Sequence, residues 1–165
     1  MLLDFLNGAN PAYLDFVLNL VDVRIAALGH YLAAVSGRPG QRYVLGGHNL
    51  RLGELLGVLK ELTGLPMPRA RVPFPVAYVS AIVSEFVADH LTRTAPRATA
   101  CGVMLARASQ PFDSSKAVRE LGLPTTSVKQ SLRDTVNWFV KQGLLERPLR
   151  RRNDASSLAD PIRSP

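Results

Sequence analysis

The sequence has little cysteine and no long uninterrupted apolar run. Of its 165 residues only Cys101 is a cysteine, so no disulfide can form within the chain. Residues 76–88 are the one segment that could be mistaken for a membrane span, but Ser80, Ser84 and Glu85 interrupt it. The segment is also shorter than the roughly 20 apolar residues that a bilayer needs. We therefore expect a reduced, cytoplasmic protein with no transmembrane helix.

The N-terminus also lacks the pattern of a secretion signal. Residues 1–4 contain no basic side chain, and Asp4 interrupts the apolar run that a signal peptide would need. This observation supports the cytoplasmic expectation.

Complete catalytic motifs are missing as well. The chain contains neither G-x-G-x-x-G nor G-x-x-x-x-G-K-[ST], and no serine lies in a G-x-S-x-G context. None of the four tyrosines is followed by lysine four residues later. The three histidines have no metal-ligand spacing with one another or with Cys101. We expect no metal site and no complete active site.

What is present indicates a folded domain followed by a basic tail. The chain is 47% hydrophobic and 20% charged, which is typical of a globular protein. Its net charge is +7, and residues 147–165 carry five arginines against two aspartates. We expect residues 1–146 to fold and residues 147–165 to form a disordered tail. No recognition module or interleaved aromatic accompanies the arginines, so a solvated tail is favoured over a nucleic-acid or membrane arm.

A glycine pair organises the middle of the chain. The apolar run 42–45 predicts a short strand, Gly46 and Gly47 follow it, and a leucine-rich segment from Leu52 to Thr63 predicts an amphipathic helix. A strand, a glycine turn and a helix in this order can cradle a phosphate. The remaining glycines of such a motif are absent, so a structural turn is the favoured interpretation.

Other patterns predict a mainly helical α/β fold with two or three short strands. Apolar residues on both faces predict a strand at 18–23. Ser127 and Gln130 form a sequence capping box at the start of the last helix. The further predicted helices cover 24–36, 75–91, 97–108, 114–121 and the residues from 128 to Gly143.

The order of these segments resembles a known family. The carrying motifs are Asn7-Gly8-x-x-Pro11-Ala12-Tyr13, Leu18-Asn19-Leu20-Val21-Asp22-Val23, Gly37 to Leu50, Phe112 to Gly122, and Ser131 to Phe139. Together they resemble the C-terminal half of an extended short-chain dehydrogenase/reductase of the NAD-dependent epimerase/dehydratase type. The resemblance is greatest to hopanoid-associated sugar epimerases and dihydroflavonol-reductase-like proteins. It implies a partial NAD(P)-binding Rossmann-like fold, of which this chain holds the C-terminal part only.

The same resemblance implies a substrate-binding role without cofactor binding. In this family the N-terminal half holds the glycine-rich loop and the catalytic Tyr and Lys, so NAD(P) is not expected to bind strongly to this chain alone. By the family pattern, Tyr13 and Asn19 face the substrate cleft, Asp22 lies beside it, and Arg107 faces the phosphate or acidic group of a sugar or nucleotide-sugar. An arginine suits a phosphate because its guanidinium can donate two parallel hydrogen bonds.

Each of these residues also has a structural alternative. Tyr13 can simply pack its ring, and Asn19 can satisfy buried backbone groups. Asp22 can cap the helix that begins near residue 24, and Arg107 can be a surface charge. His30 is expected to be structural.

The chain departs from the family pattern at two places. Ile25-Ala26 stands where the family usually has Asp followed by Val, and Arg51 stands where it usually has Thr or Ser. Arginine cannot accept a backbone N–H, so half of the capping box with Glu54 is lost, at a cost of about 1 kcal/mol. These departures fit a relaxed or truncated gene product.

Three functions remain open at this point. The first is the substrate-binding part of an NAD(P)-dependent sugar epimerase or reductase, inactive alone. The second is a non-catalytic interaction module that docks on a separately encoded N-terminal Rossmann half. The third, nucleic-acid binding through the arginine tail, is the least favoured.

Overall fold

The structure is a computed structural model, and it describes residues 1–88 and 99–149. Within these residues the chain is mostly helical, with four strands of two to four residues, as the sequence predicted in outline. The elements are α1 (Leu2–Asn7), β1 (Ala12–Tyr13), β2 (Val17–Leu20), α2 (Val23–Ser36), β3 (His48–Arg51), α3 (Leu52–Thr63), β4 (Ala70–Arg71), α4 (Phe74–Val87), α5 (Ala100–Arg107), α6 (Ser115–Leu121) and α7 (Val128–Lys141).

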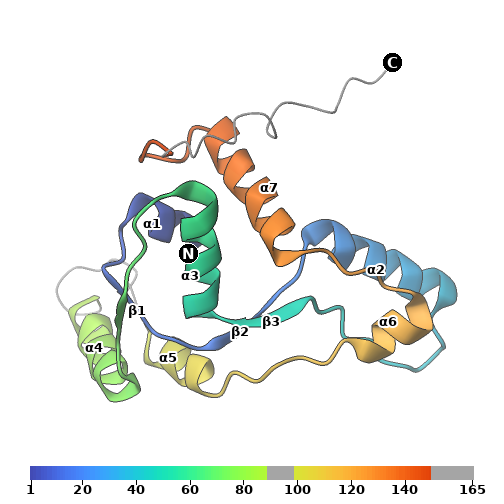
Figure 1. Cartoon of the computed structure of the whole chain (residues 1–165). Coiled ribbons are helices and arrows are strands. Elements are labelled where there is room, and N and C mark those ends of the chain that lie inside the picture. The colour runs from blue at the N-terminus through green and yellow to red at the C-terminus, as the bar shows by residue number, and fades with distance from the viewer. Residues whose placement is uncertain (89–98, 150–165) are drawn as a thin grey trace.

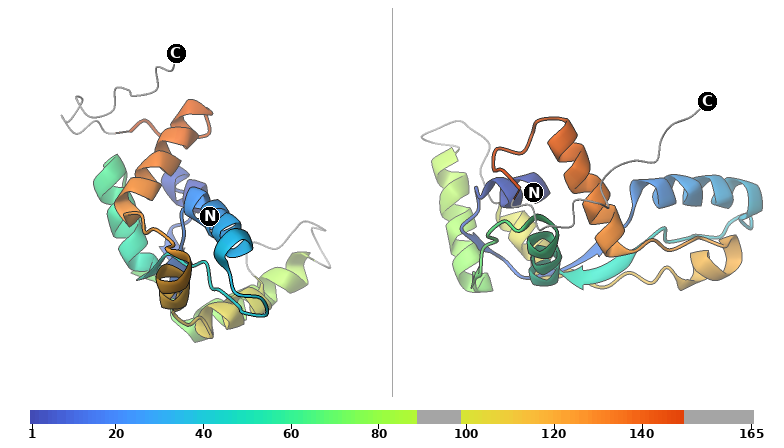
Figure 2. Two further views of the ribbon diagram at one scale, coloured as in Figure 1. Left: turned by 90° about the vertical axis from the view of Figure 1, so that its right-hand side faces the viewer. Right: turned by 45° about the horizontal axis from the view of Figure 1, so that its top comes forward.

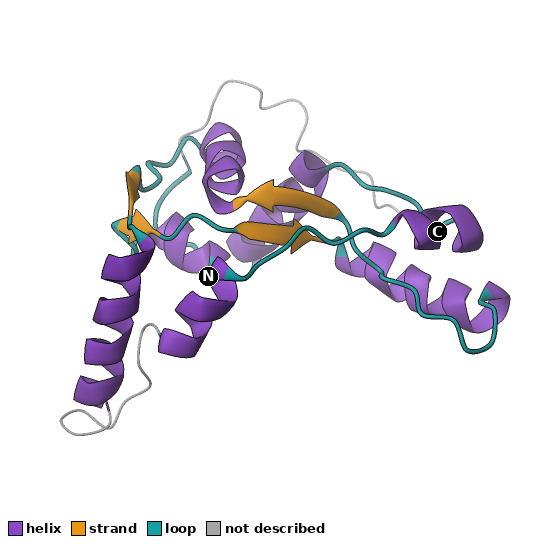
Figure 3. Cartoon of the chain, turned by 90° about the horizontal axis from the view of Figure 1, so that it is seen from below, coloured by secondary structure: helices purple, strands orange, loops and turns teal. Residues whose placement is uncertain are grey.

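The strands form two small sheets rather than one. β1 pairs with β4 in parallel, and β2 pairs with β3 antiparallel, with Asn19 opposite Asn49. The β2–β3 ribbon runs through the middle of the molecule (Figure 3). A two-stranded ribbon is marginal on its own, so these sheets depend on the helices that pack against them.

The main core gathers around α3. Its leucines recur at three- and four-residue spacing, and Leu55 and Leu59 are almost completely buried. They pack with Phe5 and Leu6 of α1 and with Leu132 of α7. The helix begins and ends as predicted, at Leu52 and Thr63, with Gly64 in the left-handed conformation just beyond it.

A distant residue supplies the cap that Arg51 cannot. The Glu54 side chain accepts the backbone N–H of Arg51 at 2.8 Å, which is the half of the capping box that remains. Asp15, in the loop between β1 and β2, accepts the N–H of Gly53 at 3.1 Å. Its other oxygen lies 3.3 Å from the Arg51 guanidinium. The first turn of α3 is therefore capped from 38 residues upstream in the sequence.

The predicted strand at 42–45 is wrong. These residues form a loop, and the strand is the more polar segment His48–Arg51 that follows the glycine pair. The side chains of Tyr43 and Leu45 instead pack against a small hydrophobic cluster that includes Ala117 and Leu121 of α6. Gly46 and Gly47 thus lead into a strand, not a helix, so the topology of a phosphate cradle is absent here.

Gly47 has a steric reason to be glycine. A Cβ at this position would collide with the backbone carbonyl of Leu20 and approach Val21 Cα to 2.9 Å. The backbone of the glycine pair lies directly against the end of β2, and only glycine permits that approach.

The starts of α7 and α6 are held by different side-chain contacts. The Ser127 side chain makes no capping bond at α7, and Gln130 donates instead to Asp134 Oδ1 at 2.9 Å, so the predicted capping box is wrong. At α6 the side chain of Asp113 accepts the N–H of Ser115 at 2.9 Å. This bond lowers the pKa of Asp113 below its ordinary value.

The molecule has a central core and two outlying helix pairs. α2 and α6 lie at one end, α4 and α5 at the other, and the α1–α3–α7 core lies between them (Figures 1 and 2). The α4–α5 pair has a small core of its own, which contains Ala77, Ala81 and Val103.

Some predictions lie wholly or partly outside the described residues. The predicted end of the long helix at Leu91 is among them, and so are residues 150–165 of the expected tail. Within residues 147–149, Leu149 packs against the main core.

Candidate functional site

Asp22 lies at the junction of β2, α2 and α7, and its side chain is only 6% exposed. It caps α2, because Oδ1 accepts the backbone N–H of Arg24 at 2.9 Å. The Arg24 guanidinium adds bonds to both carboxylate oxygens, at 2.9 Å and 2.7 Å. The Ser131 hydroxyl of α7 donates to Oδ2 at 2.8 Å. The predicted structural alternative, a helix cap, is thus present.

These contacts determine the charge state and the remaining capacity of Asp22. The Arg24 hydrogen bonds hold the pKa of this carboxyl well below its usual range, while burial opposes the shift and Ser131 reinforces it. A carboxylate offers about four lone-pair directions, and four donors already reach Asp22. Asp22 is therefore suited to holding its neighbours in place more than to binding a further hydroxyl.

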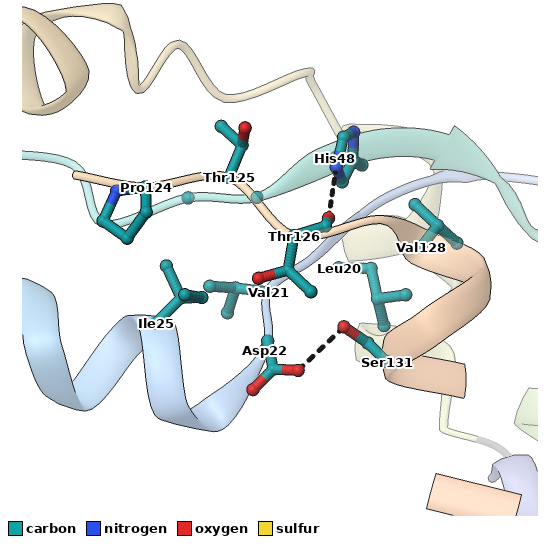
Figure 4. Close-up of a pocket in the computed structure, with 12 residues that line it drawn as sticks. Leu20, Val21, Asp22, Ile25, His48, Pro124, Thr125, Thr126, Val128 and Ser131 are labelled. Carbon is teal, nitrogen blue, oxygen red and sulfur yellow. Dashed lines mark hydrogen bonds between the residues drawn. The ribbon is translucent and has the colours of Figure 1, made fainter. Parts of the chain in front are cut away.

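Arg24, in the first turn of α2, links Asp22 to α7. Its guanidinium lies 2.7 Å from Asp134 of α7 as well as from Asp22. Asp22 and, next, Asp134 raise the pKa of Arg24 through these hydrogen bonds. Figure 4 shows the junction from the side of the small cavity, with α2 and α7 converging on Asp22.

Two hollows meet at Asp22. The smaller, of about 20 Å³, is lined by Gly46, Gly47 and His48, and by the 124–126 loop. It has room for about one water molecule, and the His48 ring is bonded across it to the Thr126 carbonyl oxygen at 2.7 Å (Figure 4).

The larger hollow, of about 500 Å³, opens between the start of α2 and α7. Its volume falls within the range of small-molecule sites. The polar part of its lining includes Asp22, Arg24 and Asp134, and the apolar part includes Trp138 and Phe139. Trp138 is 53% exposed, which leaves an indole surface open to solvent. A few charged groups beside an accessible aromatic ring are typical of small-molecule sites.

Asn19 belongs to an amide ladder on the β2–β3 ribbon. Its Oδ1 accepts the N–H of Gly47 at 2.9 Å, and its Nδ2 donates to Asn49 Oδ1 at 2.9 Å. Asn49 in turn exchanges two bonds with the backbone of Phe112, at 2.8 Å and 3.0 Å. The Asn19 side chain therefore satisfies a backbone N–H group, as its structural alternative predicted. Among the described residues, one of its N–H groups still lacks a partner.

Tyr13 is buried in the main core, where only 8% of it is exposed. Its hydroxyl accepts a hydrogen bond from Arg71 Nε at 3.0 Å, and Arg71 also lies 3.6 Å from Asp15. Tyr13 thus packs its ring and helps to hold the Asp15 loop that caps α3.

Arg107 is exposed at the end of α5, and its side chain makes no hydrogen bond or ion pair with the described residues. Its guanidinium remains available to an anionic group. Within residues 1–88 and 99–149, no hydrogen bond or ion pair joins the four predicted site residues, Tyr13, Asn19, Asp22 and Arg107, to one another.

Sequence reasoning missed the residues that build the larger hollow. No local sequence pattern marked Arg24 as a site residue, because its partners Asp22 and Asp134 lie 2 and 110 residues away in the sequence. Ser131, Asp134 and Trp138 lay inside a motif that carried the family resemblance, and that motif could have pointed to them. The predicted structural role of His30 agrees with its bond to the Ala26 carbonyl oxygen at 2.8 Å.

The described residues lack two kinds of feature that would bear on function. No group of three or more His, Cys, Asp or Glu side chains there could hold a metal ion. In the same part of the chain, no helix combines the length and the apolar character needed to cross a bilayer.

The chain is similar to three proteins that share a family. It is 41% identical over 150 residues to the "Putative dihydroflavonol 4-reductase" of Synechocystis sp., covering 88% of this chain and 43% of that protein. It is 31% identical over 145 residues to "Sterol demethylase protein B" of Methylococcus capsulatus, covering 87% and 44%. A solved nucleoside-diphosphate-sugar epimerase from Pseudomonas aeruginosa matches with a TM-score of 0.70 and 28% identity, covering 87% and 42%.

The chain spans less than half the length of each of these relatives. No protein-family model matches it. The fold agrees with the matched part of a Rossmann-like epimerase structure, and the predicted family is confirmed. This sequence and structural similarity supports the NAD-dependent epimerase/reductase family, of which the chain matches a part.

Proposed function

We propose that this chain is the substrate-binding part of an NAD(P)-dependent sugar or nucleotide-sugar epimerase or reductase. The observation that supports this most is the 41% identity to the Synechocystis protein across 88% of the chain. The glycine-rich loop and the Tyr-x-x-x-Lys of the family are absent from the sequence. Hydride transfer would therefore require residues outside this chain. The residues of this chain would orient the substrate.

The four predicted residues divide into two kinds within this proposal. Arg107, exposed and without an ionic partner among the described residues, would contact a substrate phosphate, and the remaining N–H of Asn19 would donate to a sugar hydroxyl. Asp22 and Tyr13 would act as positioning residues, because their polar groups already hold Arg24 and Arg71.

A chimera tests the proposal. The segment of the Synechocystis relative that matches this chain would be replaced by residues 1–146, and oxidation of NAD(P)H with candidate sugar nucleotides would be followed. We expect turnover, with a KM that rises about tenfold or more in Arg107→Ala while kcat changes little, since a phosphate contact would be made in both ground and transition states. Lys60→Ala, an exposed cation on α3, is the matched control.

Two results would contradict the proposal. One is a chimera that folds and binds NADPH but does not turn over. The other is micromolar binding of NAD(P) to the isolated chain in a fluorescence titration, since that would place a cofactor site in this part.

A second function rests on the surface of α2. Leu28, Tyr31 and Val35 lie at i, i+3 and i+7 and are 39%, 64% and 66% exposed. Such a stripe normally packs against another element. The chain would then be a non-catalytic module that docks on a separately encoded Rossmann half. Co-purification of that half, lost in Tyr31→Glu/Val35→Glu, would support this function, and a wild-type chain that captures no Rossmann partner would oppose it.

A further inference from the structure

Asn49 holds two other segments of the chain through one side chain. It lies in β3 opposite Asn19 of β2, so the two side chains share a face of the β2–β3 ribbon. Its Oδ1 accepts hydrogen bonds from Asn19 Nδ2 at 2.9 Å and from the N–H of Phe112 at 3.0 Å. Its Nδ2 donates to the Phe112 carbonyl oxygen at 2.8 Å. The amide therefore joins the ribbon to the segment between α5 and α6, although Asn49 is an exposed residue.

The Phe112 backbone fixes which way round the Asn49 amide lies. A side-chain amide can exchange the places of its oxygen and nitrogen by turning over, unless its partners accept only one arrangement. The N–H of Phe112 can only donate and its carbonyl oxygen can only accept, so Asn49 Oδ1 must face the first and Nδ2 the second. Asn49 then presents Oδ1 to Asn19, and only the Nδ2 of Asn19 can donate to it.

The glycine pair fixes the other end of the same series of bonds. Asn19 Oδ1 accepts the N–H of Gly47 at 2.9 Å. A Cβ on Gly46 would lie only 3.2 Å from that oxygen, so the backbone of the pair lies close against the amide. Turning the Asn19 amide over would place nitrogen against the N–H of Gly47 and oxygen against the oxygen of Asn49. Both hydrogen bonds would be lost and both new contacts would be repulsive.

These two fixed ends determine what Asn19 can offer to a ligand. One N–H of Nδ2 bonds to Asn49, and the other has no partner among the described residues. An unrestrained asparagine can present either a donor or an acceptor. Asn19 presents a donor in a fixed direction, so the matching ligand atom is an acceptor such as a hydroxyl oxygen.

We propose that Asn49 is a positioning residue for substrate recognition, which holds the Asn19 amide so that its remaining N–H donates to a sugar hydroxyl oxygen. Without Asn49, the amide of Asn19 would lose one of its two restraints, and part of the binding energy would be spent on orienting it. The inference rests on the substrate role proposed for Asn19 and adds the residue that orients that side chain.

Binding of UDP-glucose to the ¹⁵N-labelled 165-residue chain tests this role, with UDP as the reference ligand that lacks the sugar. An NMR titration gives the dissociation constant and follows the side-chain NH₂ signals of Asn19. Asn49→Ala should weaken UDP-glucose binding about fivefold, the value of about one hydrogen bond, and leave UDP binding unchanged. In the free chain, the same variant should speed the solvent exchange of the Asn19 side-chain protons, because their acceptor is lost.

Two further variants separate orientation from contact. Asn49→Asp keeps an oxygen for Asn19 and for the N–H of Phe112, so its affinity for UDP-glucose should stay within about twofold of the wild type. Asn19→Ala should weaken binding about fivefold, and adding Asn49→Ala to it should have no further effect, since Asn49 acts through Asn19.

The matched control is Asn7→Ala. Asn7 makes the same kind of paired contact with backbone, because it donates to the Leu144 carbonyl oxygen at 3.1 Å and accepts the N–H of Glu146 at 3.0 Å. Its loss should lower the melting temperature but leave UDP-glucose binding unchanged. Circular dichroism reports whether each variant folds, and Asn49→Ser replaces Asn49→Ala if the latter unfolds.

Three results would overturn the proposal. They are UDP-glucose binding that Asn49→Ala leaves unchanged, an equal loss of binding in Asn7→Ala, and additive losses in the Asn19→Ala/Asn49→Ala pair. A wild type that binds no UDP-glucose while its Asn19 protons stay protected would contradict the proposed substrate role first, and this inference would fall with it.

Discussion

Helices α3 and α4 are both rich in aliphatic residues, and they use them in opposite ways. α3 buries its leucines at the centre of the main core, while α4 buries alanines and leaves its valines exposed. Apolar content alone therefore does not decide which face of a helix is buried. The size of the residues at the contact does, since small side chains let two helices approach closely and large ones fill a wider space.

The largest expected effect is a difference in the free energy of unfolding between a variant in α3 and a variant in α4. Leu55→Ala should lower the free energy of unfolding by about 3 kcal/mol, because it leaves a cavity at a completely buried position. Val79→Ala, at a position 60% exposed, should change it by less than about 0.5 kcal/mol. Urea unfolding followed by circular dichroism gives both values. Similar losses in the two variants would contradict the contrast.

The second test replaces a small side chain with a large one where α4 packs against α5. Ala81→Leu should cost about 2 kcal/mol, because there is no room for three more carbons against Val103. Val83→Leu, on the outer face, is the control and should be nearly neutral. If Ala81→Leu is tolerated as well as Val83→Leu, the small residues do not determine how α4 packs.

The third test concerns the junction of α2 and α7, which is polar rather than packed. Because the folded-state pKa of Asp22 lies below the unfolded value, its stabilisation is present above about pH 4 and is lost as the pH falls through the folded pKa. Asp22→Asn should lower the free energy of unfolding by about 1.5 kcal/mol at pH 7. The gap between variant and wild type should narrow towards pH 3. A gap that stays constant with pH would show that the charge of Asp22 is not what stabilises the junction.

The smallest expected effect concerns the remote cap of α3. Asp15→Ala should cost about 1 kcal/mol, since the N–H of Gly53 loses its acceptor. Arg51→Ser should restore most of that loss in the Asp15→Ala background and change little in the wild type, because the local serine and Asp15 serve the same end of the helix. Thermal unfolding of the four proteins in the cycle measures the coupling. Additive effects would argue against a shared cap.

The sequence predicted α3 well because its signals are local. A leucine at every third or fourth position and Gly64 at the end both lie within the helix or next to it. The strand prediction at 42–45 was wrong because apolar residues indicate burial, not the kind of partner. Tyr43 and Leu45 are partly buried and pack against α6 instead of another strand. β3 was missed because its four residues are mostly polar and pair through the backbone.

The candidate site was less predictable than the fold. The structural alternative for Asp22, a helix cap, is present, but Ser131, which bonds Asp22, and Asp134, which bonds Arg24, belong to a helix more than 100 residues later. No local pattern indicates such a pairing. The substrate roles of Tyr13, Asn19, Asp22 and Arg107 remain predictions, and the chimera is the measurement that tests them.

The Asp15 cap has a consequence for the order in which the chain can fold. The leucine stripe can start α3 on its own, but the first turn gains its side-chain acceptor only after residues 15 and 53 meet, and closing a loop of that length costs entropy. The start of α3 should therefore be completed late, after the transition state for folding. Asp15→Ala should then accelerate unfolding while leaving the refolding rate nearly unchanged.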